Sequence, residues 1–102
     1  MQFTDMEANA SAASNLLKSM ANESRLMILC QLAESEKSVS ELKDNIGLSQ
    51  SALSQHLAIL RRDRLVDTRR AAQSIYYSLS SESAAAVMKT LYEIYCAVPE
   101  KS

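Results

Sequence analysis

Three groups of side chains in this 102-residue sequence are candidates for function. The first is a polar run with arginines behind it, SQSALSQHLAIL followed by RRDR, over residues 49–64. The second is a pair of cysteines, Cys30 and Cys96, and the third is the only histidine, His56. Hydroxyls, amides and arginines suit the reading of base edges beside phosphates, whereas two thiols suit redox or sulfur chemistry.

The polar run is typical of an amphipathic helix, because its residues divide into two arcs at about 100° per residue. One arc is mostly apolar and can anchor the helix in a core: Ala52, Leu53, His56, Leu57, Ile59 and Leu60. The other carries short hydroxyls and amides with arginines at the far end: Gln50, Ser51, Ser54, Gln55, Ala58, Arg61 and Arg62. A solvated polar face would show the same two arcs, so the neighbouring elements must decide between it and a DNA-reading face.

The segments on both sides of this helix favour a DNA-reading motif. Ser38 and Glu41 have the spacing of a capping box, which predicts a short helix to about Asn45. Gly47, the only glycine, is expected in a left-handed turn, after which Ser49 caps the polar helix. Two short helices joined by a glycine turn predict a helix-turn-helix over residues 38–63, with the second as recognition helix.

After Arg64 the apolar pattern changes from helical spacing to alternation. Residues 65–70 and 74–79 predict two strands joined by 71–73, which form a hairpin or wing over about 65–79. Its tip carries Arg69, Arg70 and Gln73, where they can reach a minor groove or backbone phosphates.

Three further helices complete a mainly α fold with a small β-hairpin, and a loop is expected over 34–37. Helical spacing predicts a first helix over 5–20, whose small residues suit close packing against a partner subunit. Asn22 is a good cap for a second helix over 23–33, where a stripe of Leu26, Leu29, Cys30 and Ala33 turns Cys30 inward. The last helix, over 82–98, is capped by Ser80 or Ser81, ends before Pro99 and has seven apolar residues at helical spacing: Ala84, Val87, Met88, Leu91, Ile94, Tyr95 and Val98.

The charge is unevenly distributed. The net charge is -1, yet residues 49–80 hold five arginines against two aspartates, which gives +3 and leaves -4 on the remainder. A local basic patch on a mildly acidic body is expected of a sequence-specific DNA binder. No apolar run of about 18 residues and no signal-peptide pattern occurs, so a cytoplasmic protein with reduced thiols, and without a permanent disulfide, is expected.

Together MANESRLMILCQL, LSQSALSQHLAILRRD and IYYSL resemble the ArsR/SmtB family of winged-helix regulators over nearly the whole chain. The placement of Cys30 and Cys96 is similar to that in its persulfide-responsive BigR/SqrR/HlyU-type group. The resemblance implies a homodimer built by the helices over 5–20 and 82–98, with recognition helices in successive major grooves of a pseudo-palindromic operator of double-stranded DNA. The residues that it implies as DNA contacts are Gln50, Ser51, Ser54 and Gln55 in the groove, Arg61 and Arg62 on phosphates or bases, and Arg69, Arg70 and Gln73 from the wing.

The resemblance also bears on what the regulator senses. Metal-sensing members use Cys in the third helix or Asp and His in the last; here the third reads SELKDN and the last has no His, so no metal or cofactor is expected. His56 is expected to be a packed, hydrogen-bonded anchor. Cys96 lies about a quarter turn off the apolar stripe beside Tyr92, within reach of a small reagent. The resemblance implies that Cys30 and Cys96 react with persulfides or polysulfides, and that the resulting crosslink weakens operator binding.

Several alternatives stay open. Two buried structural cysteines would be equally ordinary, and a repressor that responds to general thiol oxidation would carry the same pair. An activator that displaces a silencing protein needs only the same DNA binding, and a dimeric scaffold needs none. An enzyme is not expected, because no base partners the cysteines and no CxxC occurs.

One residue departs from the family pattern. Relatives place Gly where Arg64 stands, between the recognition helix and the wing. Gly accepts a positive φ at a helix end and Arg does so at a cost, so a slightly different or strained helix end is expected. Arg64 itself is either an additional cation near DNA or a solvated one.

Overall fold

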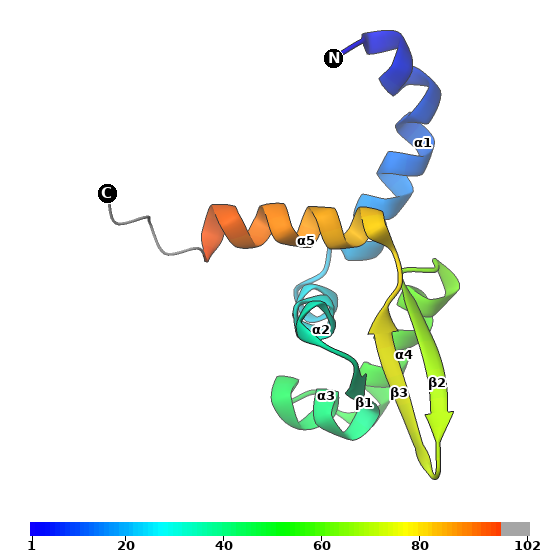
Figure 1. The fold of residues 1–102 in the computed structure, drawn as a ribbon, viewed down its shortest axis with the longest axis vertical. Helices are drawn as coiled ribbons and strands as arrows, with labels where there is room; N and C mark the ends of the chain where they lie inside the picture. Colours follow the sequence, from blue (N-terminus) through cyan, green and yellow to red (C-terminus); the bar gives the residue numbers. More distant parts are fainter. Residues whose placement is uncertain (97–102) are drawn as a thin grey trace.

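The computed structural model describes residues 1–96 as a mainly helical winged-helix domain, in agreement with the predicted class (Figure 1). The chain begins with α1 (Phe3–Met20) and α2 (Glu23–Glu34). The short strand β1 (Lys37–Ser38) then leads into α3 (Val39–Ile46) and α4 (Gln50–Arg62). The wing strands β2 (Val66–Ala71) and β3 (Ser74–Leu79) follow, and α5 (Glu82–Tyr95) ends the described part. Val98 and Pro99, the predicted end of the last helix, lie outside the described residues.

The predicted starts of α2, α3, α4 and α5 are confirmed by hydrogen bonds that backbone N–H groups donate to capping side chains. Ser38 and Glu41 form the reciprocal capping box of α3, and Gly47 ends that helix in the left-handed conformation with φ 78°. The hydroxyl of Ser49 accepts a hydrogen bond from the backbone N–H of Ala52 at 3.2 Å and so starts α4. Asn22 and Ser81 cap α2 and α5 in the same manner. The helix-turn-helix is therefore set largely by local sequence signals.

The sheet has three antiparallel strands in the order β1-β3-β2, one more than the predicted hairpin. Lys37 and Ser38 pair with Tyr77 and Tyr76 of β3. The expected loop over 34–37 is therefore wrong at Lys37, and also at Glu34, which ends α2. Two residues are too few for an alternating pattern, and this strand exists because it pairs with β3 about forty residues later. Its effect is to tie the middle of β3 to the start of α3.

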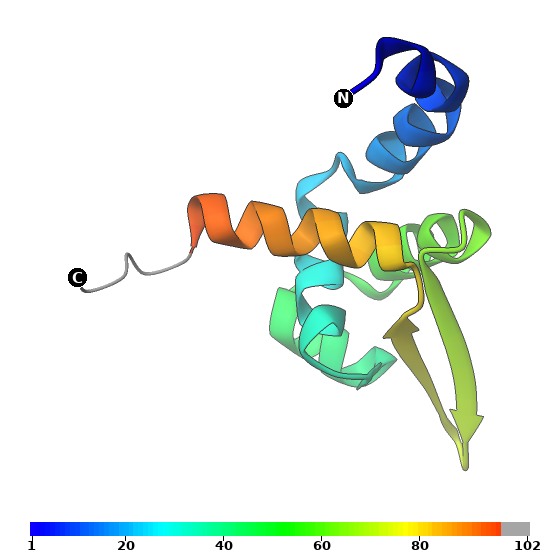
Figure 2. The same cartoon turned by 45° about the horizontal axis from the view of Figure 1, so that its top comes forward.

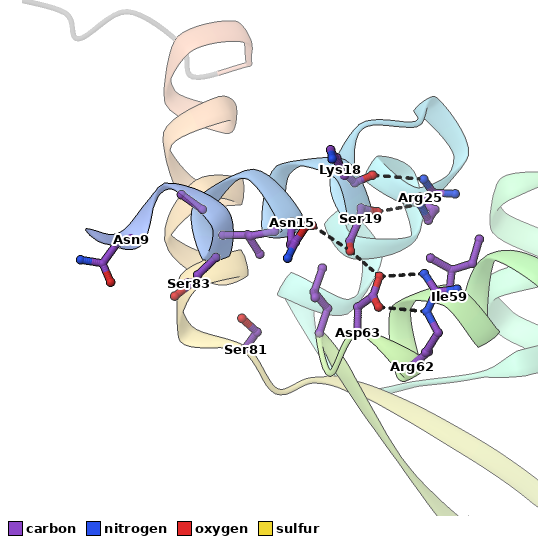
Figure 3. A pocket seen from close by; sticks show the side chains of 14 residues that line it. Asn9, Asn15, Lys18, Ser19, Arg25, Ile59, Arg62, Asp63, Ser81 and Ser83 are labelled. Carbon is purple, nitrogen blue, oxygen red and sulfur yellow. Dashed lines mark hydrogen bonds and ion pairs between the residues drawn. The ribbon is translucent and has the colours of Figure 1, made fainter. Parts of the chain in front are cut away.

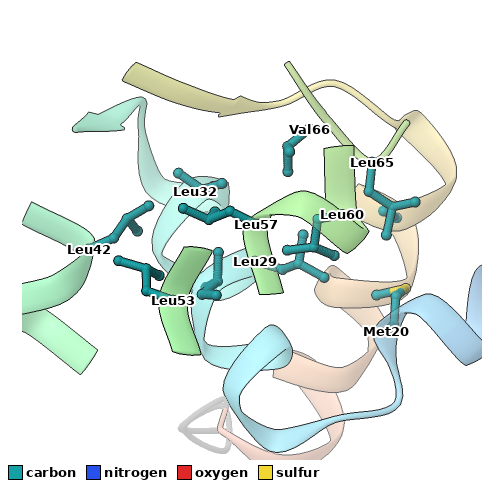
Figure 4. Close-up of a cluster of buried hydrophobic side chains, with 11 residues drawn as sticks. Met20, Leu29, Leu32, Leu42, Leu53, Leu57, Leu60, Leu65 and Val66 are labelled. Atoms are coloured by element: carbon teal, nitrogen blue, oxygen red, sulfur yellow. The ribbon is translucent and has the colours of Figure 1, made fainter. Parts of the chain in front are cut away.

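The core lies against α4 (Figure 4). Leu53, Leu57 and Leu60 of α4 are all at most 2% exposed, which confirms the apolar arc as the anchor. They pack with buried residues from the other elements: Met20, Ile28, Leu29, Leu32, Leu42, Leu65, Val66 and Ala84. Each fully buried leucine contributes roughly 1.5–3 kcal/mol, so the core fixes the rotation of α4 and keeps its polar arc outside.

The buried face of α2 differs from the predicted stripe. Its buried residues are Ile28, Leu29 and Leu32, whereas Cys30 is half-buried and Ala33 is exposed. This helix packs against α3, α4, α5 and β3, so apolar residues surround most of it. A helix that is apolar on nearly all sides has no single stripe for periodicity to identify.

Both terminal helices extend beyond the body of the domain (Figures 1 and 2). Helix α1 begins at Phe3 rather than at the predicted residue 5 and exposes Phe3, Met6 and Leu17. The first half of α5 contributes the buried Ala84, but Ile94 and Tyr95 are 64% and 79% exposed, although they belong to the predicted apolar stripe. Within residues 1–96, no helix has the length and apolar character needed to cross a membrane.

Candidate nucleic-acid interface and thiol pocket

The polar arc of α4 is exposed, as predicted. The exposed side chains on this arc are Gln50, Ser51, Ser54, Gln55, Ala58, Arg61 and Arg62. The hydroxyls and amides occupy the N-terminal half of the helix, and the arginines occupy its last turn. Donors and acceptors at the start of the helix followed by cations at its end are suited to base edges and phosphates, respectively.

A groove of about 1020 Å³ separates α4 from the wing. Five of the nine predicted DNA contacts line it: Gln50, Ser54, Arg61, Arg62 and Gln73. Ser38 and Ser40 at the start of α3 and Lys43 in its last turn also line the groove, and the sequence did not indicate them. Ser51, Gln55, Arg69 and Arg70 are exposed but do not line this groove. The groove therefore has hydroxyl and amide groups on both sides, cations on α3 and α4, and one carboxylate, that of Asp44.

The two wing arginines lie in different surroundings. Arg69 makes two hydrogen bonds of 2.7 Å to the carboxylate of Glu36 and stacks 4.7 Å from the ring centroid of Tyr76. The hydrogen bonds from Arg69 lower the pKa of Glu36 below its usual 4.5, so the pair stays ionised. Arg70 pairs across the hairpin with Ile75, and in the described part of the chain no carboxylate forms an ion pair with it. Arg70 is therefore the freer cation, and Glu36 is a partner that the sequence did not indicate.

The wing ends in a two-residue turn formed by Ala72 and Gln73. Ala72 has φ 55°, the left-handed conformation that tight hairpin turns require and that glycine usually supplies. Gln73 is exposed at the tip, in the predicted position.

Helix α4 ends in a Schellman motif. The N–H of Arg64 donates to the carbonyl of Arg61 at 3.1 Å, and the N–H of Leu65 donates to the carbonyl of Leu60 at 2.9 Å. Leu60 and Leu65 are both buried, which is the apolar contact that accompanies the motif. Arg64 occupies the left-handed position with φ 65°, so the strain that the sequence indicated at this position is present.

A polar network surrounds the same end of α4 (Figure 3). Asp63 accepts hydrogen bonds from Arg62 at 3.0 and 3.2 Å and from the hydroxyl of Ser19, at the end of α1, at 2.5 Å. The contacts with Arg62, followed by that with Ser19, lower the pKa of Asp63 below its usual 3.8. Arg62 is therefore held by a carboxylate rather than free in solvent. No pattern in the sequence indicated Ser19, which lies 44 positions before Asp63.

His56 is half-buried and hydrogen-bonded, which confirms it as an anchor. Its Nδ1 lies 3.3 Å from Nη1 of Arg25 in α2. A guanidinium can only donate, so Nδ1 is the acceptor in this contact. Arg25 also donates from Nε to the carbonyl of Ser19 at 2.6 Å, and so joins the end of α1 to the middle of α4.

Cys30 and Cys96 line one pocket of about 610 Å³ between α2 and α5. Its walls are apolar and aromatic, from residues that include Leu26, Met27, Met88, Leu91, Tyr92 and Tyr95, with Glu34 and Lys89 as its charged members. Cys30 is half-buried, less enclosed than predicted, whereas Cys96 at the C-cap of α5 is exposed and open to a small reagent, as expected. The structure thus brings together two thiols that are 66 positions apart in sequence. Within residues 1–96, no cluster of three or more His, Cys, Asp or Glu side chains is arranged to hold a metal ion.

Comparison with known proteins identifies similar regulators. Residues 22–68, from α2 to the start of β2, match the model of the bacterial regulatory protein arsR family. The chain is 54% identical over 96 residues to the transcriptional activator HlyU of Vibrio cholerae, covering 94% of this chain and 89% of that protein. It is 45% identical over 97 residues to the biofilm growth-associated repressor of Xylella fastidiosa, covering 95% and 85%. The crystal structure of the transcriptional repressor BigR from Xylella fastidiosa superposes with a TM-score of 0.90 at 44% identity, covering 96% of this chain and all of that one.

Proposed function

This chain belongs to the arsR family of bacterial regulatory proteins, and we propose that it is a repressor released from its operator when Cys30 and Cys96 react with persulfides or polysulfides. It is a DNA-binding transcriptional regulator of the HlyU and BigR type. The proposal adds that the protein represses transcription, that persulfides or polysulfides are the inducer, and that Cys30 and Cys96 are the residues that react. The observation that carries it is that both cysteines line the same apolar pocket.

The DNA-binding part of the proposal assigns α4 to the major groove. Gln50, Ser51, Ser54 and Gln55 contact base edges, because they are exposed on the N-terminal half of the helix. Arg61 and Arg62 contact phosphates at the end of the helix, and the wing contacts DNA through Arg69, Arg70 and Gln73. For Arg69 this requires exchanging the carboxylate of Glu36 for a phosphate or keeping both contacts through separate N–H groups.

The protein acts as a homodimer in this proposal. Large apolar side chains are exposed on the two terminal helices: Phe3, Met6 and Leu17 on α1 and Tyr92, Ile94 and Tyr95 on α5. Exposed apolar surface of this extent favours coverage by a partner, and a second copy places two recognition helices on a pseudo-palindromic operator.

The sensing chemistry needs no oxidant beyond the persulfide itself. A cysteine thiolate attacks the outer sulfur of RSSH, takes that sulfur and releases RSH. Closure of a sulfur bridge between two sulfur-loaded cysteines then expels hydrogen sulfide. An apolar pocket disfavours hydrated oxidants, and a chain of several sulfurs spans gaps longer than a disulfide allows, which needs Cα atoms about 4.4–6.8 Å apart.

The test is to treat the reduced protein with glutathione persulfide and to measure intact mass and operator affinity together. We expect added sulfur between Cys30 and Cys96 and weaker binding, whereas Cys30→Ser and Cys96→Ser each keep the affinity of reduced protein. An unchanged affinity of the treated wild type, or an equal response in Cys30→Ser, contradicts the proposal. A response to hydrogen peroxide that equals the response to persulfide favours a general thiol-oxidation sensor instead.

A second function is an activator that displaces a silencing protein. It is favoured by the 54% identity to the activator HlyU of Vibrio cholerae. Both functions use the same DNA contacts, so reporter transcription in a deletion strain separates them. Derepression on deletion supports a repressor, and loss of transcription supports the activator.

A further inference from the structure

Ser19 is the buried polar side chain of the described part of the chain, with 6% of its surface exposed. It lies in the last turn of α1, and its hydroxyl has two acceptors within reach: the carbonyl of Asn15 at 3.1 Å and Oδ2 of Asp63 at 2.5 Å. A hydroxyl has one proton to donate, and the charged, closer acceptor is the stronger one. The proton therefore points at Asp63, the C-cap of α4.

The backbone of Ser19 makes a second connection to the same helix. Its carbonyl, which lies in the last turn of α1 and lacks a partner within the helix, accepts the Nε hydrogen of Arg25 at 2.6 Å. Nη1 of Arg25 in turn reaches His56 in the middle of α4. The end of α1 is thus joined to α4 at two places, directly at Asp63 and through Arg25 at His56.

Asp63 links Ser19 to Arg62, which lies on the surface proposed to face DNA. Its carboxylate is held by Ser19 on one side and by Nε and Nη2 of Arg62 on the other (Figure 3). Arg62 lines the groove between α4 and the wing. A guanidinium held along one edge has already lost part of its rotamer freedom and still presents N–H groups on its other edge.

We infer that Ser19 is a positioning residue for DNA binding, which acts through Asp63 to fix the end of the recognition helix and the guanidinium of Arg62 against α1. The inference rests on the proposed role of α4 as the reading helix. Because α1 is also a proposed dimer helix, this hydrogen bond is one of the two contacts that connect the proposed dimer interface to α4.

The test compares operator affinity in full-length Ser19→Ala and Ser14→Ala over a range of salt concentrations. Ser14 lies on the same helix but is exposed, so it controls for the change of residue type. We expect Ser19→Ala to bind about three- to tenfold more weakly, the effect of one hydrogen bond. The dependence on salt should keep its slope, because the hydroxyl touches no phosphate. Ser19→Thr, which keeps the hydroxyl, should recover most of the affinity.

A double-mutant cycle with Asp63→Ala tests whether Ser19 affects operator binding through Asp63. If Ser19 acts through Asp63, Ser19→Ala has no further effect in the Asp63→Ala background. Affinity equal to that of Ser14→Ala overturns the inference. So does an undiminished loss in the Asp63→Ala background, or a lower unfolding temperature with unchanged affinity.

Gln55→Ala, measured in the same binding assay, tests separately whether α4 reads the operator sequence. Loss of sequence preference in Gln55→Ala together with full affinity in Ser19→Ala overturns the role of Ser19 alone. Unchanged sequence preference in a variant with Gln50, Ser51, Ser54 and Gln55 all replaced by Ala overturns α4 as the reading helix, and the role of Ser19 with it.

Discussion

Replacement of Arg64 by Gly should stabilise the protein, because Arg64 holds the left-handed position of a Schellman motif at φ 65°. A left-handed conformation costs an L-residue about 1–2 kcal/mol, which Gly avoids. Gly also gains freedom in the unfolded chain, which costs about 0.4–1 kcal/mol. The side chain of Arg64 is exposed and buries little surface. The mid-range values, about 1.5 and about 0.7 kcal/mol, leave a net gain of about 0.8 kcal/mol, or about 3–6 °C in Tm for a domain of this size.

The assay is thermal unfolding at one fixed protein concentration, because association makes Tm concentration-dependent. Arg61→Gly is the matched control, since it removes the same charge from the last turn of α4, where the backbone is helical. That variant should lose about 0.8 kcal/mol, the helix propensity difference between Arg and Gly. If Arg64→Gly is no more stable than the wild type, or is destabilised as much as Arg61→Gly, the strain argument is wrong.

Three further outcomes follow from the structure. Arg61→Gln should weaken operator binding and lower the slope of log affinity against log salt by about 0.9 for each phosphate that the guanidinium neutralises, whereas an unchanged slope would show that Arg61 neutralises no phosphate. Leu60→Ala, at a position with 0% exposure, should lower the free energy of unfolding by about 3–5 kcal/mol in urea titrations; a loss below about 1 kcal/mol would mean that the core refills the cavity. Because the folded pKa of Glu36 is depressed below 4.5, its contribution is present above that pH and is lost as pH falls through the lower folded value. Glu36→Gln should therefore be less stable than the wild type near neutral pH and equal to it in acid, and a difference that persists in acid would rule out the Arg69 pair as the cause.

The elements whose signals are local were predictable from the sequence. The capping box of Ser38 and Glu41, the turn at Gly47 and the cap at Ser49 each depend on residues within a few positions of one another. The two arcs of α4 were also predictable, because one face of that helix is buried and the other is open.

The contacts between residues far apart in the sequence could not be predicted from it. Glu36 meets Arg69 across 33 positions, and Ser19 meets Asp63 across 44. Neither pair has a periodic or capping pattern, so only the fold brings them together. The stripe of α5 was predicted correctly as apolar, but periodicity cannot tell whether Ile94 and Tyr95 face their own core or another surface. In the structure both side chains are exposed.

The helix that connects the thiols to the DNA surface is α2. It presents Cys30 to the pocket shared with α5, buries Ile28 and Leu29 in the core, and directs Arg25 toward α1 and His56. Helix α2 has 12 residues and lies in a close-packed interior. When it shifts on the side of α5, the residues packed against its other faces must therefore also move. Under the proposed function, a crosslink between Cys30 and Cys96 therefore does not need to reach the DNA surface. It only has to change how α2 sits against α5, because α2 contacts α4 through the core and holds the polar network at the end of α1.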